Sequence, residues 1–273
     1  MTVILLSLAS AAFFGAMAVA IRFGLAGGSA SGGALAMLTW ATAIAILASL
    51  PQHDFHRSWE FFLAGFLAPG CSQVLFTLSV REAGPSRTSV AVGAAPLVAV
   101  AIALVFLGEP VRTLLVLGAL AVVVGGGVLA AERDRPEHVR ATALLFAVAA
   151  TVFFAVRDNI IRALHAHADP EAAAAATFLG GLLVTLLWAR RPPTSRELRR
   201  LAPAGIFFAL SYICLFEAYF RGRVSVVSPL VATESLWAVG LSSLLLRHEQ
   251  VGARLAFGAL LVVAGGVLIG LGR

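Results

Sequence analysis

Long apolar runs are the feature that most constrains this chain. Ten long stretches carry almost no charge, namely residues 3–25, 33–50, 60–80, 88–107, 113–131, 141–163, 171–188, 201–220, 224–246 and 253–271. A helix that crosses a membrane needs about 20 such residues, and the connections between the runs hold turn formers such as Gly84-Pro85 and Pro192-Pro193. The sequence therefore predicts an all-α integral membrane protein with ten transmembrane helices.

Composition excludes the other broad classes. Apolar residues make up 60% of the chain and charged residues only 12%, whereas soluble domains average about 45–50% and 25%. Ten spans would leave no room for a soluble domain. The basic residues lie in short clusters between the apolar runs and form no continuous stripe, so we expect no nucleic-acid partner. We expect the two cysteines, Cys71 and Cys214, to be packing residues because neither lies in a metal or redox motif.

The second half of the chain repeats the first. Shifting the sequence against itself by 140 positions places Phe13-Phe14 on Phe153-Phe154, Arg81 on Arg221 and Glu109 on Glu249. Matches among Ala, Leu, Val and Gly arise often by chance in such an apolar composition, whereas chance matches of the rarer Arg and Glu are uncommon. We therefore predict two five-helix units, residues 1–135 and 136–273, that together form one transmembrane transport domain. The first run has a counterpart in the second half and no basic residue before it, which favours a helix of the mature protein over a secretory signal.

An odd number of helices in each unit has a topological consequence. The second unit must enter the membrane from the side opposite to the first, which gives inverted repeats related by a pseudo-two-fold axis in the membrane plane. This arrangement is characteristic of secondary transporters, in which a site near the midplane opens to each side in turn.

Several motifs recur in both halves and resemble a known family. The fourth and ninth runs are followed by Glu109 and Glu249, and the next apolar runs contain Gly125-Gly126 and Gly265-Gly266. Together with Phe14-Gly15 in the first run, these motifs resemble the EamA family of the drug/metabolite transporter superfamily over essentially the whole chain. The resemblance implies a ten-helix carrier of the inner (plasma) membrane, often an exporter of amino acids or related metabolites.

Four charged residues lie clearly within the predicted spans, away from the outermost residues, and are the first candidates for function. A charge near the bilayer centre costs at least about 2.5–3.5 kcal/mol, so it normally faces a cavity or a partner. Glu234 is the deepest and is a candidate for proton coupling or for binding a substrate ammonium group; a structural hydrogen bond is the alternative. Arg157 and Glu217 lie about one turn from the ends of helices that are expected to end on the same membrane face, where they would pair or bracket the two charges of a substrate. A structural ion pair, or snorkelling of Arg157 to the membrane interface, is the alternative. For Asp158, which is adjacent to Arg157 and points about 100° away around the helix, a structural role is favoured over a role in substrate binding.

Uncharged polar residues extend this candidate set. Those that would line a cavity are Gln73, Thr77, Pro96, Asn159, Tyr212, Thr233 and Trp237. Prolines in the fourth and ninth spans, Pro96 and Pro229, remove helix hydrogen bonds where transporters unwind to offer backbone groups to ligands. For Arg22 and Arg162, anchoring at helix ends is favoured over gating.

No nucleophile motif, metal-ligand spacing or phosphate-binding loop appears in the sequence, so we expect no enzyme activity and no cofactor. The expected partners are a small-molecule substrate, the lipid bilayer and protons, with the protein a monomer or weak dimer. A membrane scaffold or lipid-modifying protein without solute transport is the alternative, and a passive channel is disfavoured by the inverted halves.

Membrane orientation is open at the level of sequence. Thirteen arginines fall on one predicted face and six on the other. The positive-inside rule places the arginine-rich face in the cytoplasm and both termini outside. The family resemblance implies both termini inside.

Overall fold

The computed structural model describes residues 1–25, 28–51, 57–95, 97–98, 102, 113–130, 141–222, 224–246 and 252–271, and every regular element in these ranges is helical. The first half contains α1 (Thr2–Gly24), α2 (Ala30–Ser49), α3 (Ser58–Gly65), the π-helical turn η1 (Phe66–Cys71), α4 (Ser72–Ala83), α5 (Pro85–Val92) and α7 (Thr113–Ala130). The second half contains α8 (Ala141–Ala163), α9 (Pro170–Ala189), α10 (Ser195–Arg221), α11 (Val224–Val231), α12 (Glu234–Leu245) and α13 (Ala253–Leu271).

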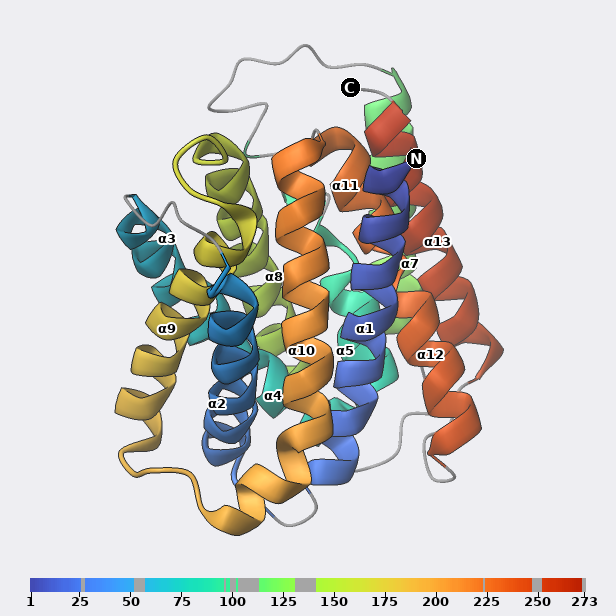
Figure 1. Ribbon diagram of the computed structural model, residues 1–273. Helices are drawn as coiled ribbons and strands as arrows, with labels where there is room; N and C mark the ends of the chain where they lie inside the picture. The colour runs from blue at the N-terminus through green and yellow to red at the C-terminus, as the bar shows by residue number, and fades with distance from the viewer. Residues whose placement is uncertain are drawn as a thin grey trace.

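The helix boundaries follow the sequence repeat. Under the shift that superposes the two halves, both ends of α2 fall on those of α9, and the start of α7 falls on the start of α13. The start of α1 and the end of α13 lie at the same end of the bundle (Figure 1). The helices thus form two sets with matching lengths, as two copies of one unit require.

Six helical segments of the described residues are long and apolar enough to cross a membrane: Thr2–Gly24, Ala30–Ser49, Ser58–Ala83, Thr142–Ala163, Pro170–Ala189 and Ser195–Arg221. A shorter apolar helix covers Ala253–Leu268. The outward side chains of these segments suit lipid, since Leu145 is 65% exposed and Leu187 is 67% exposed. The total of ten spans remains a prediction.

Three of the predicted spans, the third, fourth and ninth, are not continuous α-helices in the described residues. The third contains η1, in which the backbone dihedral angles of Ala68 are not helical. The next residue, Pro69, has no N–H to donate to a helix hydrogen bond. The ninth, expected as one helix over residues 224–246, is two: α11 ends at Val231, Ala232 and Thr233 form a turn, and α12 starts at Glu234. Pro229 leaves a helix hydrogen bond unmade just before this turn.

The fourth span breaks at the position that corresponds to the turn in the ninth. Helix α5 ends at Val92 and is followed by a turn at Gly93 and Ala94. These residues precede Thr233 and Glu234 by 140 positions. Pro96 and most of the later part of this predicted span lie outside the described residues. The two halves therefore share a helix break as well as helix lengths.

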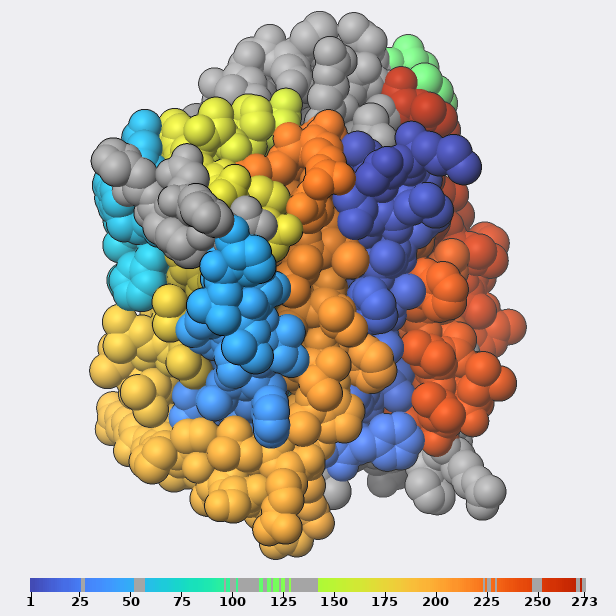
Figure 2. Space-filling view, viewed as in Figure 1, coloured from blue at the N-terminus to red at the C-terminus, as the bar shows by residue number. Residues whose placement is uncertain are grey.

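The two halves interlock across the bundle. Helix α1 packs on α10 and α4 packs on α8, while α2 contacts α10 and α3 contacts α9. The shift of 140 positions relates α1 to α8, α2 to α9, and α3 with α4 to α10. The α1–α10 contact therefore corresponds to the α8–α4 contact, and the α2–α10 contact corresponds to the α9–α3 contact. Figure 2 shows α2, α10, α1 and α12 side by side on one face of the molecule. Each half therefore buries its helices against the other half and does not form a separate core.

Glycines bring α7 and α13 into backbone contact. A Cβ atom on Gly125 would lie 2.9 Å from the carbonyl oxygen of Gly258, and one on Gly265 would lie 2.6 Å from the carbonyl oxygen of Gly118. The early glycine of each helix thus faces the late glycine of the other, so the two helices run antiparallel. Close approach through small residues is the usual way in which membrane helices associate.

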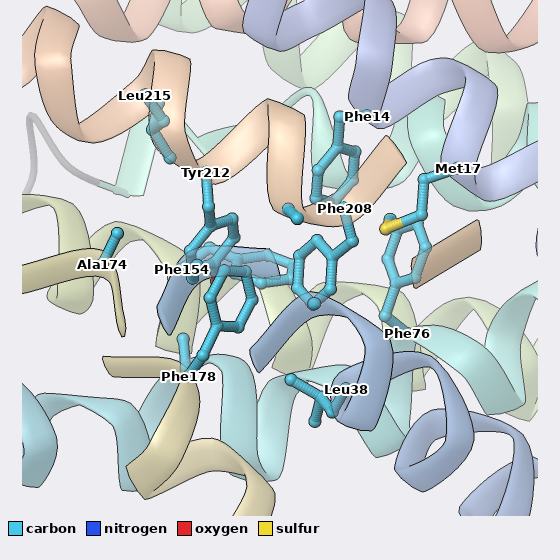
Figure 3. Packing of buried hydrophobic residues seen from close by; sticks show 14 of the residues in the cluster. Phe14, Met17, Leu38, Phe76, Phe154, Ala174, Phe178, Phe208, Tyr212 and Leu215 are labelled. Carbon is cyan, nitrogen blue, oxygen red and sulfur yellow. The ribbon is translucent and has the colours of Figure 1, made fainter. Parts of the chain in front are cut away.

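Aromatic rings fill the centre of the bundle (Figure 3). The Phe14 ring meets the Phe76 ring edge to face at a centroid distance of 5.1 Å. Tyr212 stacks on Phe178 at 4.5 Å and meets Phe208 edge to face at 4.6 Å. Such arrangements add about 0.5–1.5 kcal/mol per pair beyond the burial of area. The rings provide a rigid wall behind the polar residues described below.

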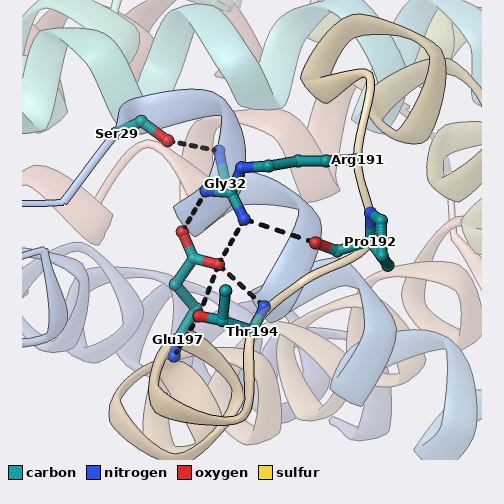
Figure 4. Close-up of polar contacts among 6 residues, drawn as sticks. All are labelled: Ser29, Gly32, Arg191, Pro192, Thr194 and Glu197. Carbon is teal, nitrogen blue, oxygen red and sulfur yellow. Dashed lines mark hydrogen bonds and ion pairs between the residues drawn. The ribbon is translucent and has the colours of Figure 1, made fainter.

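Polar contacts fix the helix ends. Thr194 and Glu197 form a capping box at the start of α10, and Arg191 pairs with Glu197 through Nη2 at 2.6 Å. The pair lies against Gly32 of α2, so that it joins the two halves (Figure 4). Hydrogen bonding to the Glu197 carboxylate raises the pKa of Arg191. This cluster pins the α9–α10 connection to the first half.

Arginines at the ends of α1 and α8 bind similar partners. Arg22 donates through Nη1 to the carbonyl oxygen of Arg81 at the end of α4, and Arg162 donates through Nη1 to that of Tyr219 near the end of α10 at 3.1 Å. Cations suit the last carbonyl groups of a helix because these groups have no partner inside the helix. The contacts favour the anchoring role for both arginines.

Candidate functional site

A buried cavity lies between the two halves. Its volume is about 30 Å³, enough for about two water molecules. Its walls come from α1, α8, α10, α11 and α12, from the end of α5 and from the turn before α12. The lining residues are Ser10, Phe14, Val92, Ala95, Phe154, Arg157, Asp158, Ser211, Leu215, Ser228, Val231, Ala232 and Glu234. Three of them are charged, which makes this cavity the candidate site.

Arg157 and Asp158 form a buried ion pair on α8. Both Nε and Nη2 of Arg157 approach Oδ1 of Asp158, at 2.8 Å and 2.7 Å. The Arg157 residue is only 4% exposed and the Asp158 residue 6%. The third nitrogen, Nη1 of Arg157, is buried and has no hydrogen-bond partner among the described residues. Leaving a buried donor of a charged group unpaired is costly, so an anionic group brought next to Arg157 would find an unused donor in Nη1.

Aromatic rings hold the guanidinium group from two sides. Its central carbon lies 4.7 Å from the ring centroid of Tyr212 and 5.4 Å from that of Phe154. Arginine stacks on such faces through cation–π attraction, which contributes about 2 kcal/mol or more at desolvated sites. These contacts and the ion pair together fix the orientation of Arg157.

Tyr219 fixes the other oxygen of Asp158. Its hydroxyl group donates to Oδ2 at 2.9 Å, and both residues are buried. The carboxylate is thus held by Arg157 on one oxygen and by α10 on the other. Asp158 is therefore an anchored group with little freedom to turn towards a ligand.

Glu234 brings a second carboxyl group to the same cavity. It is the first residue of α12, immediately after the turn, and is 4% exposed. The N-terminus of a helix favours a nearby negative charge, which explains how an acidic residue is tolerated here. Gly15 of α1 allows the close approach that places it, because a Cβ atom there would lie 3.1 Å from the Glu234 carbonyl oxygen.

Hydroxyl groups complete the polar lining. Ser10 and Ser211 are hydrogen-bonded to each other at 3.1 Å, and Ser211 also donates to the Ser10 carbonyl oxygen at 3.0 Å. Ser228 lies on α11. The cavity thus offers one cation, two carboxyl groups and small neutral donors. No group of three or more metal-ligating side chains comes together in the described part of the chain.

Among the sequence-predicted candidates that the structure describes, which do not include Pro96, Glu234 and Arg157 are the two that line the cavity. Tyr212 lies behind Arg157 and contacts its guanidinium group without lining the cavity. Gln73 and Thr77 are buried on α4 and share a hydrogen bond of 3.4 Å.

The remaining candidates lie elsewhere. Asn159 donates to the Ala155 carbonyl oxygen of its own helix, and Thr233 donates to that of Leu230 in the turn. Trp237 is 47% exposed, because α12 presents this side chain outward where it packs on α1 at Gly15. Trp237 is not among the described residues that line the cavity.

The expected pairing of Arg157 with Glu217 does not occur. Glu217 pairs with Arg221 one helical turn further along α10, with Nη2 and Oε2 2.6 Å apart. Residues at i and i+4 on a helix are natural neighbours, and Asp158 is the nearer carboxylate for Arg157. Glu217 does not line the cavity.

Sequence reasoning favoured a structural role for Asp158, which fits its ion pair with Arg157, and missed the serines Ser10, Ser211 and Ser228 of the cavity lining. The signal for Asp158 was its adjacency to Arg157 within an apolar run, since a buried charge needs a partner. The serines offered no signal, because a hydroxyl group is easily accommodated by a helix carbonyl group.

An antiparallel assembly of apolar helices around a small charged cavity is the form of a membrane transport protein. The chain matches the model of the EamA-like transporter family over residues 1–130 and 141–271, and it belongs to that family. One solved crystal structure superposes on it with a TM-score of 0.70 and 20% sequence identity, covering 97% of this chain and 95% of that one. No curated protein sequence matched the chain. The protein is thus a multi-pass membrane transporter of the drug/metabolite type.

Proposed function

We propose that this protein is a secondary active transporter that exports a small zwitterionic metabolite, such as an amino acid, from the cell through the inner (plasma) membrane. One observation carries the proposal: Arg157, whose Nη1 has no hydrogen-bond partner among the described residues, and Glu234 line the same cavity. The donor suits a substrate carboxylate, and the carboxyl group suits a substrate ammonium group.

The proposed mechanism is alternating access between two inverted five-helix repeats, residues 1–135 and 136–273. It is supported by the antiparallel contact of α7 with α13 and by the repeated helix breaks after α5 and α11. At about 30 Å³, the cavity is far smaller than the roughly 300–1,000 Å³ of ligand pockets for drug-sized molecules. A substrate larger than a few atoms therefore requires the two repeats to move apart.

Protons are the proposed coupling ion, with Glu234 as their binding group. Asp158 is already held by Arg157 and Tyr219. Glu234 lies next to the helix break, where a change in helix geometry would alter its surroundings first. Binding of a proton would then change the charge of the cavity by one unit as the protein changes faces.

Transport by purified protein in proteoliposomes tests the proposal. A panel of radiolabelled amino acids, organic acids and amines is measured with and without an imposed pH gradient. We expect saturable movement of at least one zwitterion, faster with the gradient. Movement of no solute under either condition would contradict the proposal and leave a scaffold or lipid-modifying role. A reporter fused at Arg273 determines whether the termini lie inside or outside.

A further inference from the structure

The charge balance of the cavity carries one more inference, which rests on the proposed function. Arg157 contributes one positive charge, and Asp158 neutralises it through contacts to Nε and Nη2. Both residues are almost fully buried, so a change in this balance is only weakly screened by solvent. A ligand that enters must fit the charge that the pair leaves behind.

We propose that Asp158 sets the charge of the substrate that this site accepts. With Asp158 in place, Arg157 keeps one donor for a carboxylate but gives the cavity no net positive charge. A simple anion would therefore bring an unbalanced charge into a low-dielectric site, whereas a zwitterion would not. Asp158 acts through Arg157 and is a specificity-determining residue without contacting the substrate carboxylate itself.

Tyr219 is the positioning residue for this arrangement. Its hydroxyl group holds Oδ2 of Asp158, which keeps Oδ1 turned towards Arg157. The aromatic rings of Phe154 and Tyr212 prevent the guanidinium group from swinging away. Nη1 of Arg157 is therefore the nitrogen that remains for a ligand. The preference for a zwitterion over a simple anion is thus set by contacts that exist before a ligand binds.

A test must prevent Glu234 from taking over as the counter-ion of Arg157. We therefore compare Glu234→Gln with the double variant Glu234→Gln/Asp158→Asn, and use propionate, a simple monocarboxylate, as the probe. Affinity is measured by titration calorimetry on purified protein in detergent. The cavity is neutral in the first variant and carries one positive charge in the second. We expect the second to bind propionate at least about tenfold more tightly.

The matched control is Glu234→Gln/Glu217→Gln, which removes a carboxylate of α10 that lies outside the cavity and should leave propionate affinity unchanged. A propionate affinity that is equal in the two test variants would overturn the proposal. Tyr219→Phe in the Glu234→Gln background should give a smaller gain, since it loosens Asp158 and keeps its charge.

Folding is checked by size-exclusion chromatography and thermal unfolding. If Glu234→Gln/Asp158→Asn does not fold, Arg157→Gln/Asp158→Asn is used instead, because it removes both charges of the ion pair. This second variant must fold and must not bind propionate. Its failure to fold would also overturn the proposal. The propionate measurement distinguishes a failure of this inference from a failure of the proposed function. If the wild-type protein moves no zwitterion but Glu234→Gln/Asp158→Asn binds propionate more tightly than Glu234→Gln does, the transport proposal fails and the role of Asp158 stands.

Discussion

The rings of Phe14 and Phe154 meet edge to face at a centroid distance of 5.9 Å and an interplanar angle of 87°. These residues are 140 positions apart, so each is the counterpart of the other in its half. A residue touches its own counterpart only near the axis that relates two repeats. Both rings line the cavity, and so do the counterparts Val92 and Ala232. The candidate site therefore lies on the pseudo-two-fold axis.

Shortening Phe154 to alanine should widen the substrate range. The change removes a cavity wall and one ring that faces Arg157. In competition assays in proteoliposomes, we expect larger zwitterions to inhibit transport more strongly, relative to small ones, than they do in the wild-type protein. Phe153→Ala is the control, because that ring does not line the cavity. An unchanged order of substrates in Phe154→Ala would count against the ring as a size limit.

Gly15→Ala should displace α12 from α1. The added Cβ atom would lie 2.7 Å from Cβ of Trp237 and 2.9 Å from the Ala238 nitrogen, closer than atoms tolerate. Overpacking typically costs about 1–3 kcal/mol, and here it would also move Glu234. We expect a lower thermal unfolding midpoint and slower transport. The control is Gly240→Ala on α12, where an added Cβ atom meets nothing within 4 Å and should be harmless. Equal effects of the two substitutions would contradict the contact.

Arg157→Lys should weaken substrate binding while keeping the charge. A lysine ammonium group is a single point of charge and cannot form the planar fork to Asp158 and still present a separate donor. Since a hydrogen bond to a charged group contributes about 1.5–3 kcal/mol, we expect affinity to fall about ten- to a hundredfold. Binding is measured by ligand-induced thermal stabilisation. Arg221→Lys, on the exposed side of α10, serves as the control, and wild-type affinity in Arg157→Lys would argue against the Nη1 role.

Glu234→Gln should uncouple transport from the pH gradient. Glutamine cannot take up or release a proton but preserves the shape of the side chain. We expect exchange of substrate across the membrane to continue, while accumulation driven by the gradient disappears. Parallel measurements on Glu217→Gln should show intact coupling. Gradient-driven accumulation by Glu234→Gln would remove Glu234 from the proposed mechanism.

Thr194→Ala should destabilise the start of α10. Thr194 accepts a hydrogen bond from the backbone N–H of Glu197 and donates to its carboxylate. Loss of such a cap costs about 1 kcal/mol, which we expect as a lower midpoint of thermal unfolding in detergent. Ser195→Ala, one residue later and exposed, should leave the midpoint unchanged. An equal effect at both positions would show that the cap contributes nothing specific.

The helical class and the repeated unit could be predicted from sequence, because span length and the spacing of the repeat depend on local composition. Glu234 and Arg157 could be found as well, since a charge in an apolar run needs a partner or a cavity. The choice of partners could not. Arg157 folds back onto its neighbour Asp158 while Glu217 pairs along its own helix, and both outcomes depend on rotamers within the packed bundle. The outward turn of Trp237 likewise follows from how α12 restarts after the break.

The break before α12 has a counterpart after α5, but the groups placed there differ. Glu234 corresponds to Ala94, and Arg157 and Asp158 correspond to Met17 and Ala18. The two repeats thus supply similar scaffolds, while the ionisable groups among the described lining residues all come from the second. Exchanging the conformations of the two repeats would therefore not return an energetically equivalent state. In the proposed alternating-access cycle, the forms open to the two sides of the membrane therefore need not bind the same ligand with equal affinity.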